Sequence, residues 1–145
     1  DELLLWEPIT DGRAYLDTLA RRLVESLDSS LSIAPREWHA RLAANPAELA
    51  REGIGFEIGD RLLAELLELA PASLQPPSAA RCVWVHDGHA PEAAEVMQRW
   101  RRAGSNVDGQ VLHHEFDWIA EEALNTALVP AEVVQRLTAL VTQRP

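Results

Sequence analysis

The sequence predicts an α/β protein built on a small parallel sheet, and three observations lead to this fold class. Leu3–Trp6 and Cys82–Val85 are short apolar runs without polar alternation, which is typical of strands buried on both faces. Val107–Leu112 is a third strand candidate, weakened by Gly109. Apolar residues recur at helical spacing between and after these runs. The later part of the chain therefore alternates strand and helix, as a parallel sheet requires.

The helices are predicted from their end signals and their apolar spacing. The first runs from Asp11–Gly12 to about Ser30, with leucines recurring on one face. Pro35 opens a second helix, which Asn45–Pro46 breaks. Asp60 is expected to cap a leucine-rich amphipathic helix. Two further helices open at prolines and follow the second and third strands: they begin at Pro91 and Pro130.

The predicted organisation is a single domain over residues 1–145. Its parts are a core strand (1–10), a helical cap (11–70), a Pro-rich linker (71–80) and further core strands and helices (81–145). A chain of 145 residues and 16.1 kDa is large enough for one such core.

Composition limits the function classes. The formal net charge of -10 disfavours a surface that tracks phosphates, so no nucleic-acid partner is expected. No apolar run approaches the roughly 20 residues of a membrane-spanning helix. The single cysteine, Cys82, cannot close an intrachain disulfide. No export signal is visible, so a cytoplasmic location is expected.

Several stretches resemble one protein family. Leu4–Leu16, which contains Leu-Trp-Glu-Pro-Ile-Thr-Asp-Gly, resembles the sixth strand and following turn of α/β-hydrolases, and most closely the exosortase-A-associated hydrolases. Gly55–Leu62 resembles the segment with which the helical cap of that family returns to the core. Arg81–Val85 and Val107–His114 are similar to its seventh and eighth strands. The resemblance implies part of a hydrolase-like fold, with about three parallel strands, flanking helices and a helical cap insert.

The resemblance also implies a function. The family's nucleophile lies in a Gly-x-Ser-x-Gly motif, which this sequence lacks. The chain would therefore be the C-terminal portion of a hydrolase acting on an ester, thioester or amide, and inactive alone. The family's acid and base correspond to Asp87 and His114. Trp38 and Trp118 are candidates for the wall of a pocket that takes a small apolar acyl substrate. No cofactor is expected.

A partner is expected for the sheet. Three parallel strands are fewer than most sheets contain, and buried strands need neighbours. The chain enters its first strand almost directly after Asp1. We therefore expect an N-terminal half or a partner chain that completes the sheet.

Other interpretations of the same residues stay open. Asp87–Gly88 is a common turn pair, and histidines at strand ends are ordinary polar loop residues. His86 and His89, with His113 or His114, would bind zinc if they converge at the carboxyl ends of neighbouring strands. The alternative function is a non-catalytic binding or assembly module with a hydrolase-derived fold.

Overall fold

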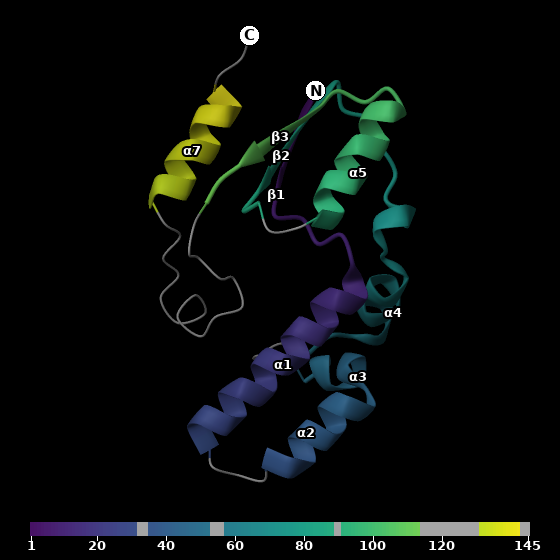
Figure 1. The fold of residues 1–145 in the computed structure, drawn as a ribbon, viewed down its shortest axis with the longest axis vertical. Coiled ribbons are helices and arrows are strands. Elements are labelled where there is room, and N and C mark those ends of the chain that lie inside the picture. The colour runs from purple at the N-terminus through teal and green to yellow at the C-terminus, as the bar shows by residue number, and fades with distance from the viewer. Residues whose placement is uncertain (32–34, 53–56, 89–90, 114–130, 143–145) are drawn as a thin grey trace. The chain divides into compact units, whose positions relative to one another are not determined.

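A computed structural model of the chain describes residues 1–31, 35–52, 57–88, 91–113 and 131–142. The chain divides into two compact units: a sheet unit, formed by Asp1–Pro8 and Leu74–Pro145, and a helical unit, Ile9–Ser73 (Figure 1). The helical unit is an insertion between the first and second strands, where the sequence predicts a helical cap. None of the helices in these described ranges is long and apolar enough to cross a membrane.

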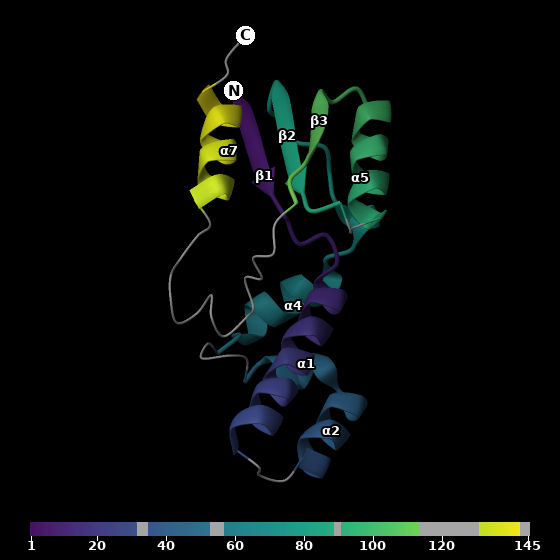
Figure 2. The same cartoon turned by 60° about the vertical axis from the view of Figure 1, so that its left-hand side comes forward.

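The sheet consists of β1 (Glu2–Trp6), β2 (Arg81–His86) and β3 (Val107–Val111). All three are parallel, and they lie in that order (Figure 2). The central strand β2 is buried on both faces, because Cys82 to Val85 are each at most 4% exposed. The predicted α/β fold class with three parallel strands and flanking helices is confirmed.

Helices lie on both sides of the sheet. The helix α5 (Pro91–Arg102) connects β2 to β3, and α7 (Ala131–Thr142) lies on the opposite side of the sheet from α5 (Figures 1 and 2). Val96 and Trp100 of α5 join Trp84 of β2 in one buried apolar cluster. The rings of Trp84 and Trp100 lie 5.3 Å apart in a tilted arrangement that aromatic pairs favour.

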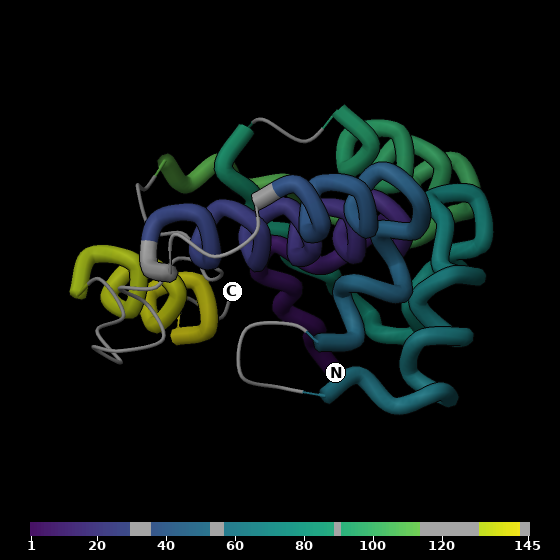
Figure 3. The backbone as a smooth tube through the Cα atoms, turned by 90° about the horizontal axis from the view of Figure 1, so that it is seen from below, coloured from purple at the N-terminus to yellow at the C-terminus, as the bar shows by residue number. Residues whose placement is uncertain are grey.

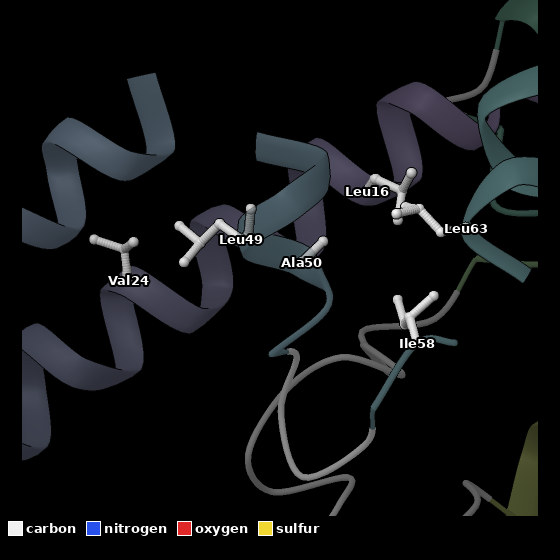
Figure 4. Packing of buried hydrophobic residues seen from close by; sticks show 7 residues of the cluster. Leu16, Val24, Leu49, Ala50, Ile58 and Leu63 are labelled. Carbon is white, nitrogen blue, oxygen red and sulfur yellow. The ribbon is translucent and has the colours of Figure 1, made fainter. Parts of the chain in front are cut away.

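The helical unit has its own apolar core. Its described elements are α1 (Gly12–Leu31), α2 (Pro35–Ala44), α3 (Pro46–Ala50), α4 (Asp60–Glu68) and a short 3-10 turn, η1 (Pro71–Ser73). The helices α1 and α2 lie side by side (Figure 3). Leu16, Ala20 and Val24 recur at helical spacing on α1 and pack with Leu49 of α3 and Leu63 of α4 (Figure 4).

The Asp11–Gly12 pair has a structural role at the start of this unit. The Asp11 carboxylate accepts a hydrogen bond from the Ala14 N–H at 2.9 Å and so caps α1. Gly12 lies where α1 crosses the end of α4: its N–H donates to the Leu69 carbonyl at 3.0 Å. A Cβ at Gly12 would lie 1.9 Å from the Leu66 carbonyl oxygen, so this crossing requires glycine.

The predicted cap of α4 is wrong. Gly59 occupies the N-cap position and Asp60 is the first helical residue, with no side chain capping the helix. The Asp60 carboxylate instead pairs with the Arg51 guanidinium at 2.6 Å. This hydrogen bond raises the pKa of Arg51. The Asp60 carboxylate therefore connects the start of α4 to Arg51 at the end of α3.

Candidate functional site

The carboxyl ends of the strands meet at one edge of the sheet, which is where open parallel sheets bind ligands. At the end of β1, the Glu7 N–H donates to the Val85 carbonyl of β2 at 2.9 Å. The turn 86–88 follows β2. A Cβ at Gly88 would lie 3.5 Å from Cε1 of His113, just beyond β3. The structure therefore brings the 86–88 turn and His113 side by side. His89 and His114, which were predicted to join them, lie outside the described residues.

Asp87 is the middle residue of a tight turn. Gly88 has a φ of 94°, a left-handed conformation that glycine adopts without strain. The Gly88 N–H donates to Nδ1 of His86 at 3.1 Å, and the His86 carbonyl accepts from the Leu112 N–H at 2.8 Å. Because Nδ1 is the acceptor, the neutral imidazole carries its proton on Nε2. Asp87 is half-buried in this turn.

Glu7 is a residue of this edge that the sequence analysis missed. Its φ of 43° lies in the left-handed region, which is uncommon for residues other than glycine. Strained residues of this kind cluster at functional sites. The local signal was the Glu7–Pro8 pair, and a residue before proline is normally extended. The pattern therefore pointed away from the conformation that the structure has.

The outer edge of β1 offers backbone hydrogen-bonding groups. In a parallel ladder, the N–H and C=O of successive residues point alternately to the two sides of the strand. Because the Glu7 N–H bonds to β2, the backbone groups of Leu3 and Leu5 also face β2. The N–H and C=O of Leu4 consequently point away from β2, along the outer edge.

The outer edge of β3 is covered by a charged side chain. The Leu112 N–H bonds to His86 of β2, so the alternation points the carbonyl of Val107 outward. This carbonyl accepts a hydrogen bond from Nε of Arg101 at 2.8 Å. A charged side chain on an edge strand discourages the addition of a further strand. The two edges of the sheet are therefore not equivalent.

A charged network lies at the opposite, amino end of the sheet. Arg81 of β2 pairs with Glu2 of β1 at 3.4 Å and with Asp108 of β3 at 3.6 Å. The Asp108 carboxylate also accepts a hydrogen bond from the Gln110 amide at 2.9 Å. The pairs are partly exposed, so each one stabilises little. Their position links the three strands at the end away from Asp87.

Trp38, one of the predicted pocket-wall residues, is half-buried against the core of the helical unit. The Arg41 guanidinium carbon lies 4.6 Å from the centroid of its ring, within cation–π range. Arg41 also pairs with Glu52, and this hydrogen bond raises the pKa of Arg41. Trp38 therefore packs within its own unit. Trp118, the other predicted wall residue, lies outside the described residues.

Two further chemistries concern the thiol of Cys82 and a zinc site. Cys82 is fully buried in β2, and burial raises the pKa of its thiol, which disfavours the nucleophilic thiolate. In the part of the chain that the structure describes, no group of three or more His, Cys, Asp or Glu side chains is placed to hold a metal ion. The zinc hypothesis requires His89, which lies outside that part, so it stays a prediction.

No protein-family model, no curated protein and no solved structure matches this chain. The features that bear on function are the strand order, the helical insertion and the residues at the carboxyl ends of the strands.

Proposed function

We propose that this chain is the C-terminal portion of an α/β-hydrolase-like enzyme that acts on an ester, thioester or amide. One observation carries the proposal: the turn that contains Asp87 lies beside His113 at the carboxyl ends of two adjacent parallel strands. This is the arrangement in which an acid after one strand and a histidine after the next can act together. The helical insertion between β1 and β2 supports the same assignment, since the family resemblance implies a helical cap there.

In this proposal Asp87 orients a histidine, and His114 is the base that takes the proton of a serine. The serine and the oxyanion-hole donors come from a segment that this chain does not contain. Alone, the chain is inactive because a base without a nucleophile in reach transfers no acyl group. In this proposal the substrate carries an apolar acyl group, and Trp38 and Trp118 stay the candidate residues for contacting it.

The segment that supplies the serine adds its strand at β1. The backbone groups of Leu4 point outward from β1, whereas Arg101 covers the corresponding edge of β3 at Val107. Leu4→Pro removes one outward N–H and leaves the β1–β2 ladder bonds in place, whereas Leu5→Pro removes an N–H that faces β2. We expect Leu4→Pro to weaken association with the missing segment while β1 and β2 remain paired.

The test is expression of the complete reading frame that contains this chain, followed by treatment with a fluorophosphonate probe and p-nitrophenyl esters. We expect one labelled serine, outside these residues, and ester hydrolysis. Asp87→Asn should lower kcat by a factor of about 10⁴, because the histidine then loses its orienting carboxylate. Asp108→Asn, at the amino end of the sheet, is the matched control and should change kcat by less than about twofold. Full kcat in Asp87→Asn, or no labelled serine, contradicts the proposal.

The alternative function is a non-catalytic binding or assembly module, and one observation favours it. Gly88 has a left-handed φ of 94°, so the turn itself accounts for an Asp–Gly pair without any chemistry. Native mass spectrometry of the protein purified from its source separates the two functions. A second polypeptide in the complex, without a probe-reactive serine in either chain, supports the module. A complex or longer chain that does react with the probe supports the hydrolase.

A further inference from the structure

The turn at Asp87 is fixed by the residues on both sides of it. On one side, the His86 carbonyl accepts the Leu112 N–H at 2.8 Å, which continues the ladder between β2 and the end of β3. On the other, Gly88 lies close to Val111 and His113, with a Cβ position 3.4 Å from Cγ1 of Val111. The hydrogen bond from the Gly88 N–H to Nδ1 of His86, at 3.1 Å, closes the turn.

We infer that His86 is a positioning residue, which holds the backbone at Asp87 in place by accepting the Gly88 N–H on Nδ1. The inference rests on the proposed function only for what the Asp87 carboxylate does. The hydrogen bond and the turn geometry are properties of this chain alone. His86 needs no contact with a substrate for this role, because it acts through Gly88.

The role requires an acceptor at one position of the side chain. A neutral imidazole with its proton on Nε2 provides that acceptor, whereas an imidazolium presents N–H groups at both nitrogens. The side-chain amide oxygen of asparagine is attached at the same distance from the backbone as Nδ1, so it can accept the same N–H. Glutamine places its amide one carbon further out. Leucine fills space in the turn and accepts nothing.

The first experiment uses the chain as it is, with the hydrogen exchange of the Gly88 amide measured by NMR. Loss of one hydrogen bond should speed this exchange about fivefold in His86→Leu. His86→Asn should exchange as the unaltered chain does, and His86→Gln should resemble His86→Leu. Exchange at the Trp84 amide, inside β2, reports whether a variant is still folded. Equal Gly88 exchange in all four folded proteins overturns the inference, as does a ¹⁵N shift that shows Nδ1 of His86 protonated.

The second experiment uses the complete reading frame. His86→Leu should lower kcat with little change in KM, because Asp87 is misplaced while the acyl pocket is intact, and His86→Asn should restore kcat. A fall in kcat that His86→Asn does not restore overturns the positioning role. If the unaltered protein hydrolyses no ester, the proposed function fails, and the exchange measurement still decides whether His86 holds the turn.

Discussion

Gly12→Ala tests the packing of the helical unit most directly. The new carbon would lie 1.9 Å from the carbonyl oxygen of Leu66 and 2.6 Å from its carbonyl carbon, whereas Cβ atoms essentially never approach within 3.0 Å. The obstacle is backbone rather than the end of a flexible side chain. The helices α1 and α4 must therefore move apart by about 1 Å at their crossing.

The cost of this movement follows from the contacts at the crossing. Separation breaks the 3.0 Å hydrogen bond from the Gly12 N–H to the Leu69 carbonyl, a loss of about 1 kcal/mol. Loosening the contact between Leu16 and Leu63 adds about 1–3 kcal/mol. The better helix propensity of alanine returns less than about 1 kcal/mol. We expect the free energy of unfolding of the helical unit to fall by about 1–4 kcal/mol.

The assay is urea unfolding followed by ¹⁹F NMR of protein labelled with 5-fluorotryptophan. Trp38 reports the helical unit, and Trp84 and Trp100 report the sheet unit. The Trp38 transition should move to lower urea with an unchanged slope. Gly59→Ala is the matched control: nothing lies within 4 Å of its Cβ position, and the cost at this N-cap should be under about 1 kcal/mol. Equal Trp38 midpoints in the two variants would refute the close crossing.

Three further predictions concern other residues. Asp11→Ala should destabilise the helical unit by about 1 kcal/mol, because α1 loses its N-cap, and Asp11→Ser should recover most of this stability. An unchanged urea midpoint at Trp38 in Asp11→Ala would contradict the capping role. Arg101→Met should expose the Val107 carbonyl and promote concentration-dependent association, measured by sedimentation. An unchanged oligomeric state would contradict the role of Arg101 in preventing strand addition at β3. Cys82 should react with a disulfide reagent only after urea unfolds the sheet unit, because the thiol is buried and burial raises its pKa. Rapid reaction of the native chain would contradict the burial of Cys82 in β2.

The elements that the sequence predicted correctly are those whose causes are local or periodic. The run Cys82–Val85 lacks polar alternation because both faces of β2 are covered, and the structure confirms that strand. The cap at Asp60 was wrong because its carboxylate has a partner in Arg51, nine residues away in the sequence, that no local pattern reveals. Glu7 was missed because the pair with proline indicated an extended residue, whereas its φ of 43° is left-handed.

The candidate site was partly predictable for a topological reason. Parallel strands end at a common edge, so the polar residues after β2 and β3 were expected to meet, and the 86–88 turn does lie beside His113. The hydrogen bond between Gly88 and His86 was not predictable, because it depends on a side-chain conformation that residue types alone do not specify. The predicted roles of His114 and Trp118 stay predictions, since both residues lie outside the described ranges.

The stretch that most resembles the hydrolase family also has a purely structural explanation. How the helical unit packs and whether the protein is catalytic are therefore separate questions. Asp11 caps α1 and Gly12 permits its crossing with α4, so packing within the helical unit accounts for both residues. The resemblance at these residues therefore supports the architecture rather than the chemistry. Evidence for chemistry has to come from Asp87 and its neighbours. Gly12→Ala can destabilise the helical unit as predicted even if the complete protein hydrolyses no ester, and in that case the helical insertion belongs to a protein that binds rather than hydrolyses.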